Sequence, residues 1–138
     1  MLSPEELIRT IYLGDRGCCG ISADSIAKRV LISVDCISRV RSPNGQWNFY
    51  SDEDIDKGML AFEGVSWFEM TPPGPLPEDY ISEFRIESTS DGIYTFCFAA
   101  GADLPQPESA SRTTTIKIRI KAKEFYLLDP RSPDRRIY

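Results

Sequence analysis

The chain has 138 residues, with 21 acidic and 16 basic side chains and a net charge of -5. This charge argues against binding to nucleic acid or anionic lipid, which attract basic surfaces. It suits a basic protein as partner, but most acidic proteins are simply soluble, and the charge alone does not select a partner. The absence of histidine excludes Ser-His-Asp and Cys-His catalysis and the usual zinc sites. The composition therefore favours a non-enzymatic protein.

The length and the ordinary apolar fraction predict one domain over residues 1–138. The first residues lack the basic start of a signal peptide, and no segment approaches the ~18 apolar residues that span a membrane. We therefore expect a cytoplasmic protein without membrane contact, in which all four cysteines are free thiols. Cys36 and Cys97 lie within apolar strand patterns, which predicts that they are small core residues.

The first predicted element is a short helix that begins after Ser3 and ends before Gly14. Ser3 and Glu6 have the spacing of a capping box, and Pro4 suits the first helical position. One face of this helix carries the apolar residues Leu7, Ile8, Ile11 and Tyr12. A helix this short is unstable alone in water, so its apolar face must pack on a sheet. Residues 15–20 are predicted to form a flexible link.

Strand patterns dominate the rest of the chain. They cover residues 21–24, 30–36, 59–70, 80–88, 93–98, 113–121 and 125–128. Gly64 interrupts the longest of them and predicts a bulge or a close approach of the backbone. Asp91 and Gly92 form the strongest hairpin signal. We predict a turn at 42–45, a polar loop at 101–111 and a tail after Leu128.

Hairpin-like spacing, without the alternation of strands and helices that parallel sheets need, predicts an α+β fold that is mostly β. We expect an antiparallel curved sheet or a small β-sandwich. The one short N-terminal helix would be packed on it.

The segment 36–65 has the densest turn chemistry, and it contains the candidate binding residues Trp47, Phe49, Tyr50, Asp52 and Asp54. Aromatic side chains are favoured at binding hot spots because they bury a large area with few rotatable bonds. In an alternative interpretation the three aromatic side chains fold back onto the core. Arg39 and Arg41 would then pair with the carboxylates and hold the turn closed.

Acidic residues of the same segment have part of the spacing of a calcium loop. Asp52, Asp54, Asp56 and Glu63 stand where an EF-hand has ligands 1, 3, 5 and 12. Lys57 replaces the glycine that this loop needs at position 6, and a strand pattern follows in place of a helix. We therefore interpret the segment as a solvated turn in which aspartates cap backbone amides, and we predict no metal site and no cofactor.

A basic stripe follows the outward face of the strand pattern at 113–121 and consists of Lys117, Arg119, Lys121 and Lys123. Such a stripe deters association at an open sheet edge, or it pairs across strands with Glu83 and Glu87. Nucleic-acid binding is disfavoured because no stacking aromatic residue shares this face. No spacing among the carboxylates selects an acid-base pair, so we name no catalytic residues.

Two segments are distinctive, the opening LIRTIYLGDRGC and the stretch ISRVRSPNGQWNFYSDEDI, and a DP-rich tail follows Leu128. With these segments the chain resembles a family of short, uncharacterised bacterial proteins, a domain of unknown function. The similarity extends over nearly the whole chain and departs from the family near 20–28 and in 101–111. The resemblance implies no known chemistry, so it transfers no functional residues.

Our leading functional hypothesis is a non-enzymatic, cytosolic protein-binding module. An immunity-type protein, which neutralises a partner by covering its surface, is the specific form considered. The alternative is a small-ligand-binding protein or a carboxylate-based enzyme with a cleft in the β-sheet. A homodimer that joins strands at an edge is a third possibility.

Overall fold

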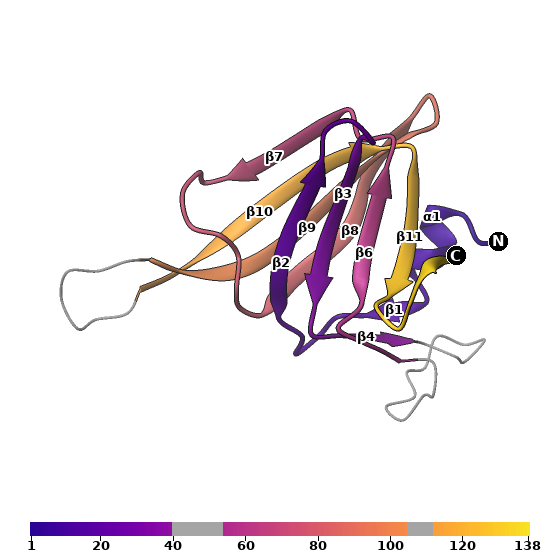
Figure 1. The fold of residues 1–138 in the computed structure, drawn as a ribbon. Helices are drawn as coiled ribbons and strands as arrows, with labels where there is room; N and C mark the ends of the chain where they lie inside the picture. The colour runs from indigo at the N-terminus through magenta and orange to yellow at the C-terminus, as the bar shows by residue number, and fades with distance from the viewer. Residues whose placement is uncertain (40–53, 105–111) are drawn as a thin grey trace.

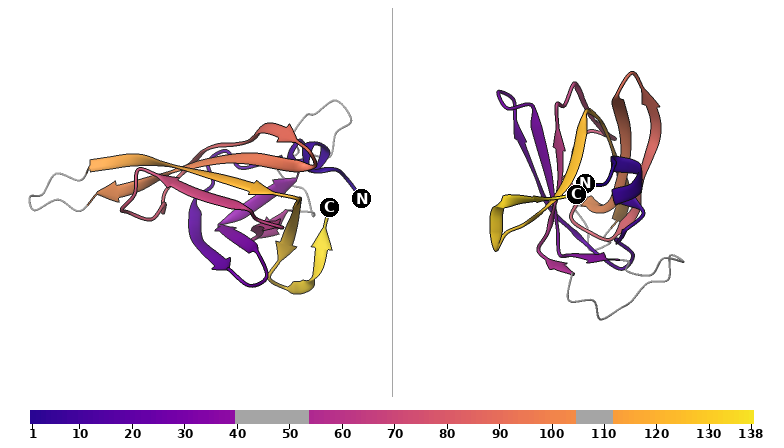
Figure 2. Two further views of the ribbon diagram at one scale, coloured as in Figure 1. Left: turned by 90° about the horizontal axis from the view of Figure 1, so that it is seen from above. Right: turned by 90° about the vertical axis from the view of Figure 1, so that its right-hand side faces the viewer.

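The computed structural model describes residues 1–39, 54–104 and 112–138. Strands make up most of these residues, and they form two large antiparallel sheets and a small third sheet (Figure 1). The two large sheets lie face to face as two layers, which Figure 2 (right) shows side by side. The predicted α+β, mostly β fold is therefore confirmed in its sandwich form.

Each large sheet combines strands from distant parts of the chain. The five-stranded sheet has the order β12 (Ser132–Ile137), β11 (Glu124–Asp129), β6 (Met59–Glu63), β3 (Arg29–Val34) and β2 (Cys18–Asp24). The four-stranded sheet has the order β7 (Trp67–Thr71), β10 (Arg112–Ala122), β9 (Ile93–Leu104) and β8 (Ile81–Ser90). The small sheet consists of β1 (Ile11–Tyr12), β4 (Cys36–Arg39) and β5 (Ile55–Asp56).

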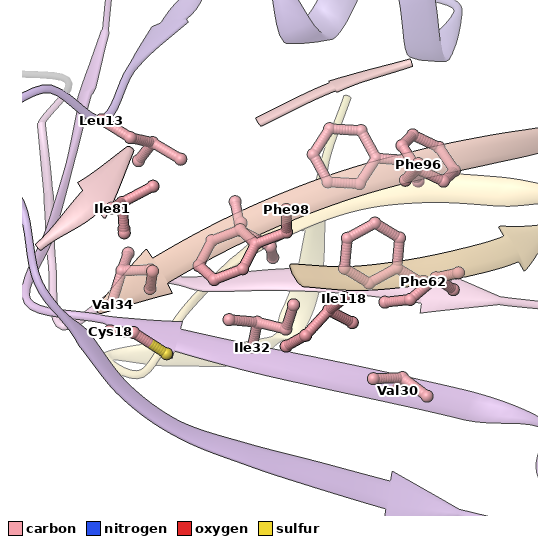
Figure 3. Close-up of a cluster of buried hydrophobic side chains, with 14 of the residues drawn as sticks. Leu13, Cys18, Val30, Ile32, Val34, Phe62, Ile81, Phe96, Phe98 and Ile118 are labelled. Atoms are coloured by element: carbon pink, nitrogen blue, oxygen red, sulfur yellow. The ribbon is translucent and has the colours of Figure 1, made fainter. Parts of the chain in front are cut away.

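The two large sheets bury a shared apolar core. The isoleucines predicted to face inward from one strand are all buried, namely Ile116, Ile118 and Ile120. Phe62 of β6 lies with its ring centroid 5.0 Å from that of Phe96 in the other layer and 5.3 Å from that of Phe125 in its own layer. Figure 3 shows side chains from both layers pointing toward one another in this core.

The N-terminal helix α1 (Pro4–Ile8) has the predicted capping box. The Glu6 N–H donates to Ser3 Oγ at 3.2 Å, and the Ser3 N–H donates to Glu6 Oε2 at 2.8 Å. Leu7 is fully buried, and the helix packs on β11. The predicted extension of the helix to Gly14 is wrong, because residues 11 and 12 instead pair with β4 and start the small sheet.

The segment 59–70 was expected to be one strand, but it forms β6 in one sheet and β7 in the other. Gly64 stands at the break with φ of 66°, a conformation that favours glycine. A Cβ at this position would lie 3.0 Å from the Cβ of Lys123. The predicted close approach at Gly64 is thus confirmed, while the single strand is wrong because the chain here leaves one layer and enters the other.

The chain passes between the two layers a second time, and this second crossing lies against the first crossing at Gly64. The Lys123 N–H, between β10 and β11, donates to the Glu63 carbonyl at 3.0 Å, and the Ser66 N–H donates to the Lys121 carbonyl at 2.9 Å. Two chain segments about 60 residues apart therefore pass between the layers together, and they hydrogen-bond to each other as they do so.

Three other expectations need correction. The predicted link at 15–20 is wrong in part because β2 begins at Cys18, and the predicted loop at 101–111 is wrong over 101–104, where β9 still pairs with β10. The predicted tail contains β12, which pairs with β11. In all three segments the pairing partner, which local sequence does not reveal, supplies the hydrogen bonds of a strand.

Two smaller predictions can be compared directly. Asp91 and Gly92 do form the turn of the β8–β9 hairpin, with φ of 53° and 76°, as the favoured two-residue turn requires. All four cysteines are free, but only Cys97 of the two expected core cysteines is buried, whereas Cys36 is half-buried.

The turn predicted at 42–45 lies outside the described residues. The part of the chain that the structure describes has no helix with the length and apolarity to cross a bilayer.

We expect the substitution Gly64→Ala to destabilise the fold by about 1–3 kcal/mol, because it combines an unfavourable φ with a contact against Lys123. Urea unfolding of the purified protein measures this loss. Gly20→Ala is the matched control, since a Cβ at Gly20 would meet no atom within 4 Å. The control should stay within about 0.5 kcal/mol of the wild type, and an equal loss in both variants would contradict the role of the crossing.

Candidate functional site

Four of the five predicted binding residues, Trp47, Phe49, Tyr50 and Asp52, lie outside the described residues, as does Arg41. The fifth, Asp54, is half-buried at the start of β5. Its Oδ1 accepts a hydrogen bond of 2.9 Å from the backbone N–H of Arg39, at the end of β4. Through this hydrogen bond Asp54 joins the ends of β4 and β5 in the small sheet. The contact is structural and uses the backbone of Arg39.

Asp54 also lines a polar hollow of about 390 Å³ with Arg39, Asp129, Arg131 and Arg135. Asp129 accepts hydrogen bonds from Arg131 Nε at 3.1 Å and from a terminal nitrogen of the same guanidinium at 2.9 Å. These bonds lower the pKa of Asp129. Both carboxylates of the hollow are therefore already bound to donors of the protein itself.

The described acidic residues of the calcium-like spacing do not converge. Asp56 lies in β5 of the small sheet, whereas Glu63 ends β6 in the five-stranded sheet. A strand rises about 3.3 Å per residue, so the length of β6 separates Glu63 from the turn that precedes it. Among the described residues no group of three acidic or cysteine side chains is arranged to hold a metal ion.

Glu63 instead belongs to a network on the outward face of the five-stranded sheet. Tyr126 donates its hydroxyl to Glu63 at 3.0 Å, and Arg136 of β12 pairs with the same carboxylate at 3.0 Å. The Arg136 guanidinium lies 4.5 Å from the centre of the Tyr126 ring, and Tyr138 packs beside that ring. Tyr126 is therefore only 1% exposed, and the network fastens the last strand of the chain to the sheet.

The surroundings of this network shift two pKa values. Burial opposes ionisation of Glu63, but the hydrogen bond from Tyr126 and the contacts with Arg136 outweigh it and lower the pKa of Glu63. Burial, and then the hydrogen bond to Glu63, raise the pKa of Tyr126. Glu63 is thus kept ionised and Tyr126 protonated, an arrangement suited to holding the sheet together rather than to proton transfer.

The basic stripe lies on the outward face of β10, and its expected pairing with acidic residues is confirmed for one partner. Arg119 Nε lies 3.2 Å from a carboxylate oxygen of Glu87. The two residues reach each other across β9, where the buried Cys97 stands between their strands. Glu83 pairs with Arg85 on its own strand instead.

The most exposed pair of neighbouring aromatic side chains in the described residues lies elsewhere, on β7. Trp67 is 52% exposed and Phe68 is 40% exposed. They border a groove of about 250 Å³ between β7 and the β2–β3 hairpin, with Val30 and Val65 in its lining. Figure 1 shows β7 along the upper left of the molecule, next to the upper ends of β2 and β3. We call this groove and its two aromatic side chains the edge groove.

The hairpin side of the edge groove is built by local hydrogen bonds. Asp24 Oδ1 accepts from the N–H groups of Ile26 and Ala27 at 3.0 and 2.9 Å, which shapes the turn. The Lys28 carbonyl then accepts from the Val65 N–H at 2.9 Å. This last bond joins the hairpin to the crossing that follows Gly64, so both walls of the edge groove are fixed to the same point of the fold.

The β7 side is held by Glu69. Its carboxylate accepts from Trp67 Nε1 at 3.2 Å and from Thr71 Oγ1 at 3.1 Å, and Lys121 Nζ lies 5.9 Å from the centre of the Trp67 ring. These contacts fix the indole on the outward face of the strand. Because side chains alternate along a strand, Phe68 lies on the opposite face, toward the edge groove.

Our sequence reasoning missed the edge groove. Trp67 and Phe68 stood within the expected strand 59–70, where they would have been ordinary sheet residues. One signal was available, since Pro72 and Pro73 follow the strand pattern after Thr71, and proline in or beside a strand is confined to sheet edges. An aromatic pair next to such a stop is consistent with an edge strand.

One known family matches the sequence, and it is described as a family of unknown function, DUF6258; the match covers residues 1–138. The chain belongs to this family. Membership in DUF6258 confirms the resemblance to an uncharacterised domain family over the whole sequence. No curated protein and no solved structure matches the chain. The support for the edge groove as a binding site therefore comes from its geometry.

The Glu63 network generates a prediction about acid stability. Because the pKa of Glu63 is lowered on folding, its contribution is fully present above the unfolded value of about 4.5 and is lost as the pH falls through the lower folded value. Glu63→Gln should destabilise the protein by about 1–2 kcal/mol at pH 7 and should flatten the loss of stability below pH 4.5. Urea unfolding at several pH values measures both effects.

Two further variants distinguish the effect of the Glu63 network on stability from the effect of removing any one negative charge. Tyr126→Phe removes only the hydroxyl donor and should reproduce part of the change. Asp91→Asn makes the same change in net charge at the exposed β8–β9 turn, and it should alter stability at pH 7 by no more than about 0.5 kcal/mol. Parallel acid curves for Glu63→Gln and the wild type would contradict the prediction.

Proposed function

We propose that this protein is a non-enzymatic protein-binding module and that the edge groove is its binding surface. The observation that carries the proposal is the pair Trp67 and Phe68, two exposed aromatic side chains beside a groove that lies at the edge of a sheet and is lined by both apolar and charged residues. Burying such side chains against a partner releases water from a large apolar area. Tryptophan is also among the residues most enriched at the energetic centre of protein interfaces.

The fixed geometry of the edge groove supports the same proposal. Trp67 is held by Glu69 and Lys121, so less side-chain freedom is lost when a partner covers the indole. The groove volume of about 250 Å³ accommodates a single large apolar side chain more readily than a whole metabolite. These features are suited to an apolar anchor from another protein.

The proposal also covers the charge of the partner and the cellular compartment. With a net charge of -5 the protein would attract a basic partner, and the encounter would be faster at low ionic strength. We place it in the bacterial cytoplasm, where free thiols remain reduced. A small, acidic, β-rich domain suits one specific form of this function, in which the protein neutralises a toxic partner as an immunity protein does.

The polar hollow around Asp54 carries the alternative, a small-ligand-binding protein or a carboxylate-based enzyme. Three arginine side chains and two carboxylates converge there around about 390 Å³. A small anion would fit this chemistry better than a cation. A thermal shift with inorganic phosphate or citrate that disappears in Arg135→Ala would favour this alternative, because Arg135 lines the hollow from the exposed strand β12.

We expect the double substitution Trp67→Ala and Phe68→Ser to weaken partner binding by about 30-fold or more, since two hot-spot side chains contribute at least ~1 kcal/mol each. The partner would be isolated on the immobilised wild-type protein and purified, and its Kd would be measured by calorimetry for each variant. Thermal unfolding would check that the double variant and the control variant are folded.

Tyr80→Ala is the matched control, because Tyr80 is 67% exposed but does not line the edge groove. Its Kd should equal that of the wild type. Unchanged binding by the double variant would reject the edge groove as the surface, and the same measurement on Trp47→Ala and Asp54→Ala would then test the surface predicted from sequence. Failure to isolate any specific protein, together with a phosphate response at the polar hollow, would favour the alternative function.

A further inference from the structure

We infer that the partner contributes an extended segment that adds as a new strand to the free edge of β7, with alternating apolar and basic side chains. This inference rests on the proposed function and names the chemistry that the edge groove recognises. It follows from the edge of β7 that pairs with no described strand, from the strand already paired with β7, and from the charge at the middle of β7.

β7 is a terminal strand. Among the described strands it pairs with β10 alone, so its other edge presents N–H and C=O groups that no described strand satisfies. Such an edge is a template for main-chain pairing with another chain. β7 is five residues long and carries neither lysine nor proline within it, the residues that most often blunt an exposed edge.

β10 shows which kind of strand fits beside β7. On the outward face Arg119 lies opposite Glu69, and on the inward face Ile120 lies opposite Phe68. Basic and apolar residues alternate along this part of β10. Its isoleucines lie opposite apolar residues of β7, and Arg119, which pairs with Glu87, carries its charge opposite that of Glu69. A strand on the free edge would meet the same two faces of β7, so the same alternation suits it.

The edge groove supplies the apolar half of this match. Phe68 and Val65 border it, so an apolar side chain on the inward face of an added strand would extend into the groove. Glu69 favours basic residues on the outward face of the added strand, because it carries a negative charge at the centre of that face of β7. The net charge of -5 acts in the same direction at longer range.

A second copy of this chain fits the edge less well. Antiparallel pairing of two β7 strands about their middle residue would place Glu69 directly opposite Glu69 of the other copy, and like charges in that position are destabilising. A segment of a different, basic protein avoids this repulsion.

The first probe is a synthetic peptide of residues 115–123, TIKIRIKAK, which has the required alternation and is taken from β10 itself. We expect saturable binding to the full-length protein in fluorescence anisotropy. A control peptide with glutamate at its four basic positions should bind at least about tenfold more weakly, and raised salt should weaken the basic peptide. Glu69→Gln should weaken binding several-fold, whereas Asp91→Asn, with the same change in net charge, should not.

The second measurement separates main-chain pairing from side-chain contact. One peptide is N-methylated at Ile118 and Ile120 and another at Lys117, Arg119 and Lys121, so that each loses the amide donors of one edge. Strand addition requires that one of the two peptides loses binding and the other keeps it. Hydrogen exchange should also slow at amides of residues 67–71 when the unmodified peptide binds.

Each other result overturns the inference in a recognisable way. Equal binding, or equal loss, for the two methylated peptides excludes pairing along one edge. Absence of peptide binding, while the isolated partner still loses affinity for Trp67→Ala with Phe68→Ser, rejects strand addition but keeps the proposed function. A concentration-dependent dimer in sedimentation, with residues 67–71 protected without peptide, would make a second copy the occupant and also overturn the inference.

Discussion

The paired crossing at Gly64 and Lys123 is the constraint on which the arrangement of the two layers depends. The chain passes from the five-stranded sheet to the four-stranded sheet after Glu63 and returns after Ala122, and the two passages are hydrogen-bonded to each other. Their backbones approach so closely that a Cβ at Gly64 would lie 3.0 Å from the Cβ of Lys123. Glycine at this position thus lets two sheets made from interleaved segments pack on one core.

The edge groove is a consequence of that crossing. β7 begins three residues after Gly64, and the Val65 N–H bonds to the β2–β3 hairpin as the chain turns. The turn places Trp67 and Phe68 at the start of an edge strand, one on each face. Had the strand pattern continued through Gly64, both side chains would have extended a strand of the five-stranded sheet.

Two outward carboxylates, one on each large sheet, are engaged within the protein. Glu63 is bound by Tyr126 and Arg136 on one sheet, and Glu87 by Arg119 on the other. An exposed ion pair such as that of Glu87 and Arg119 contributes little stability by itself, but it satisfies charges that would otherwise attract other partners. The aromatic pair on β7 is the most exposed pair of neighbouring aromatic side chains in the described residues, and its apolar area is still available to a partner.

The sequence by itself determined the features that depend on neighbours along the chain. The capping box at Ser3, the positive φ at Asp91 and Gly92, and the inward alternation of β10 follow from local sterics and from a period of two, so they were predictable. Family membership was also visible in the sequence, because it rests on residue order alone.

Only the tertiary structure decided which strand lies beside which. The pairing of residues 11–12 with β4, the strand at the tail and the change of sheet at Gly64 depend on partners that are distant in sequence. The candidate site followed the same division. Trp67 and Phe68 look like any strand residues until their strand is known to be an edge, and that position is a property of the assembled sheet.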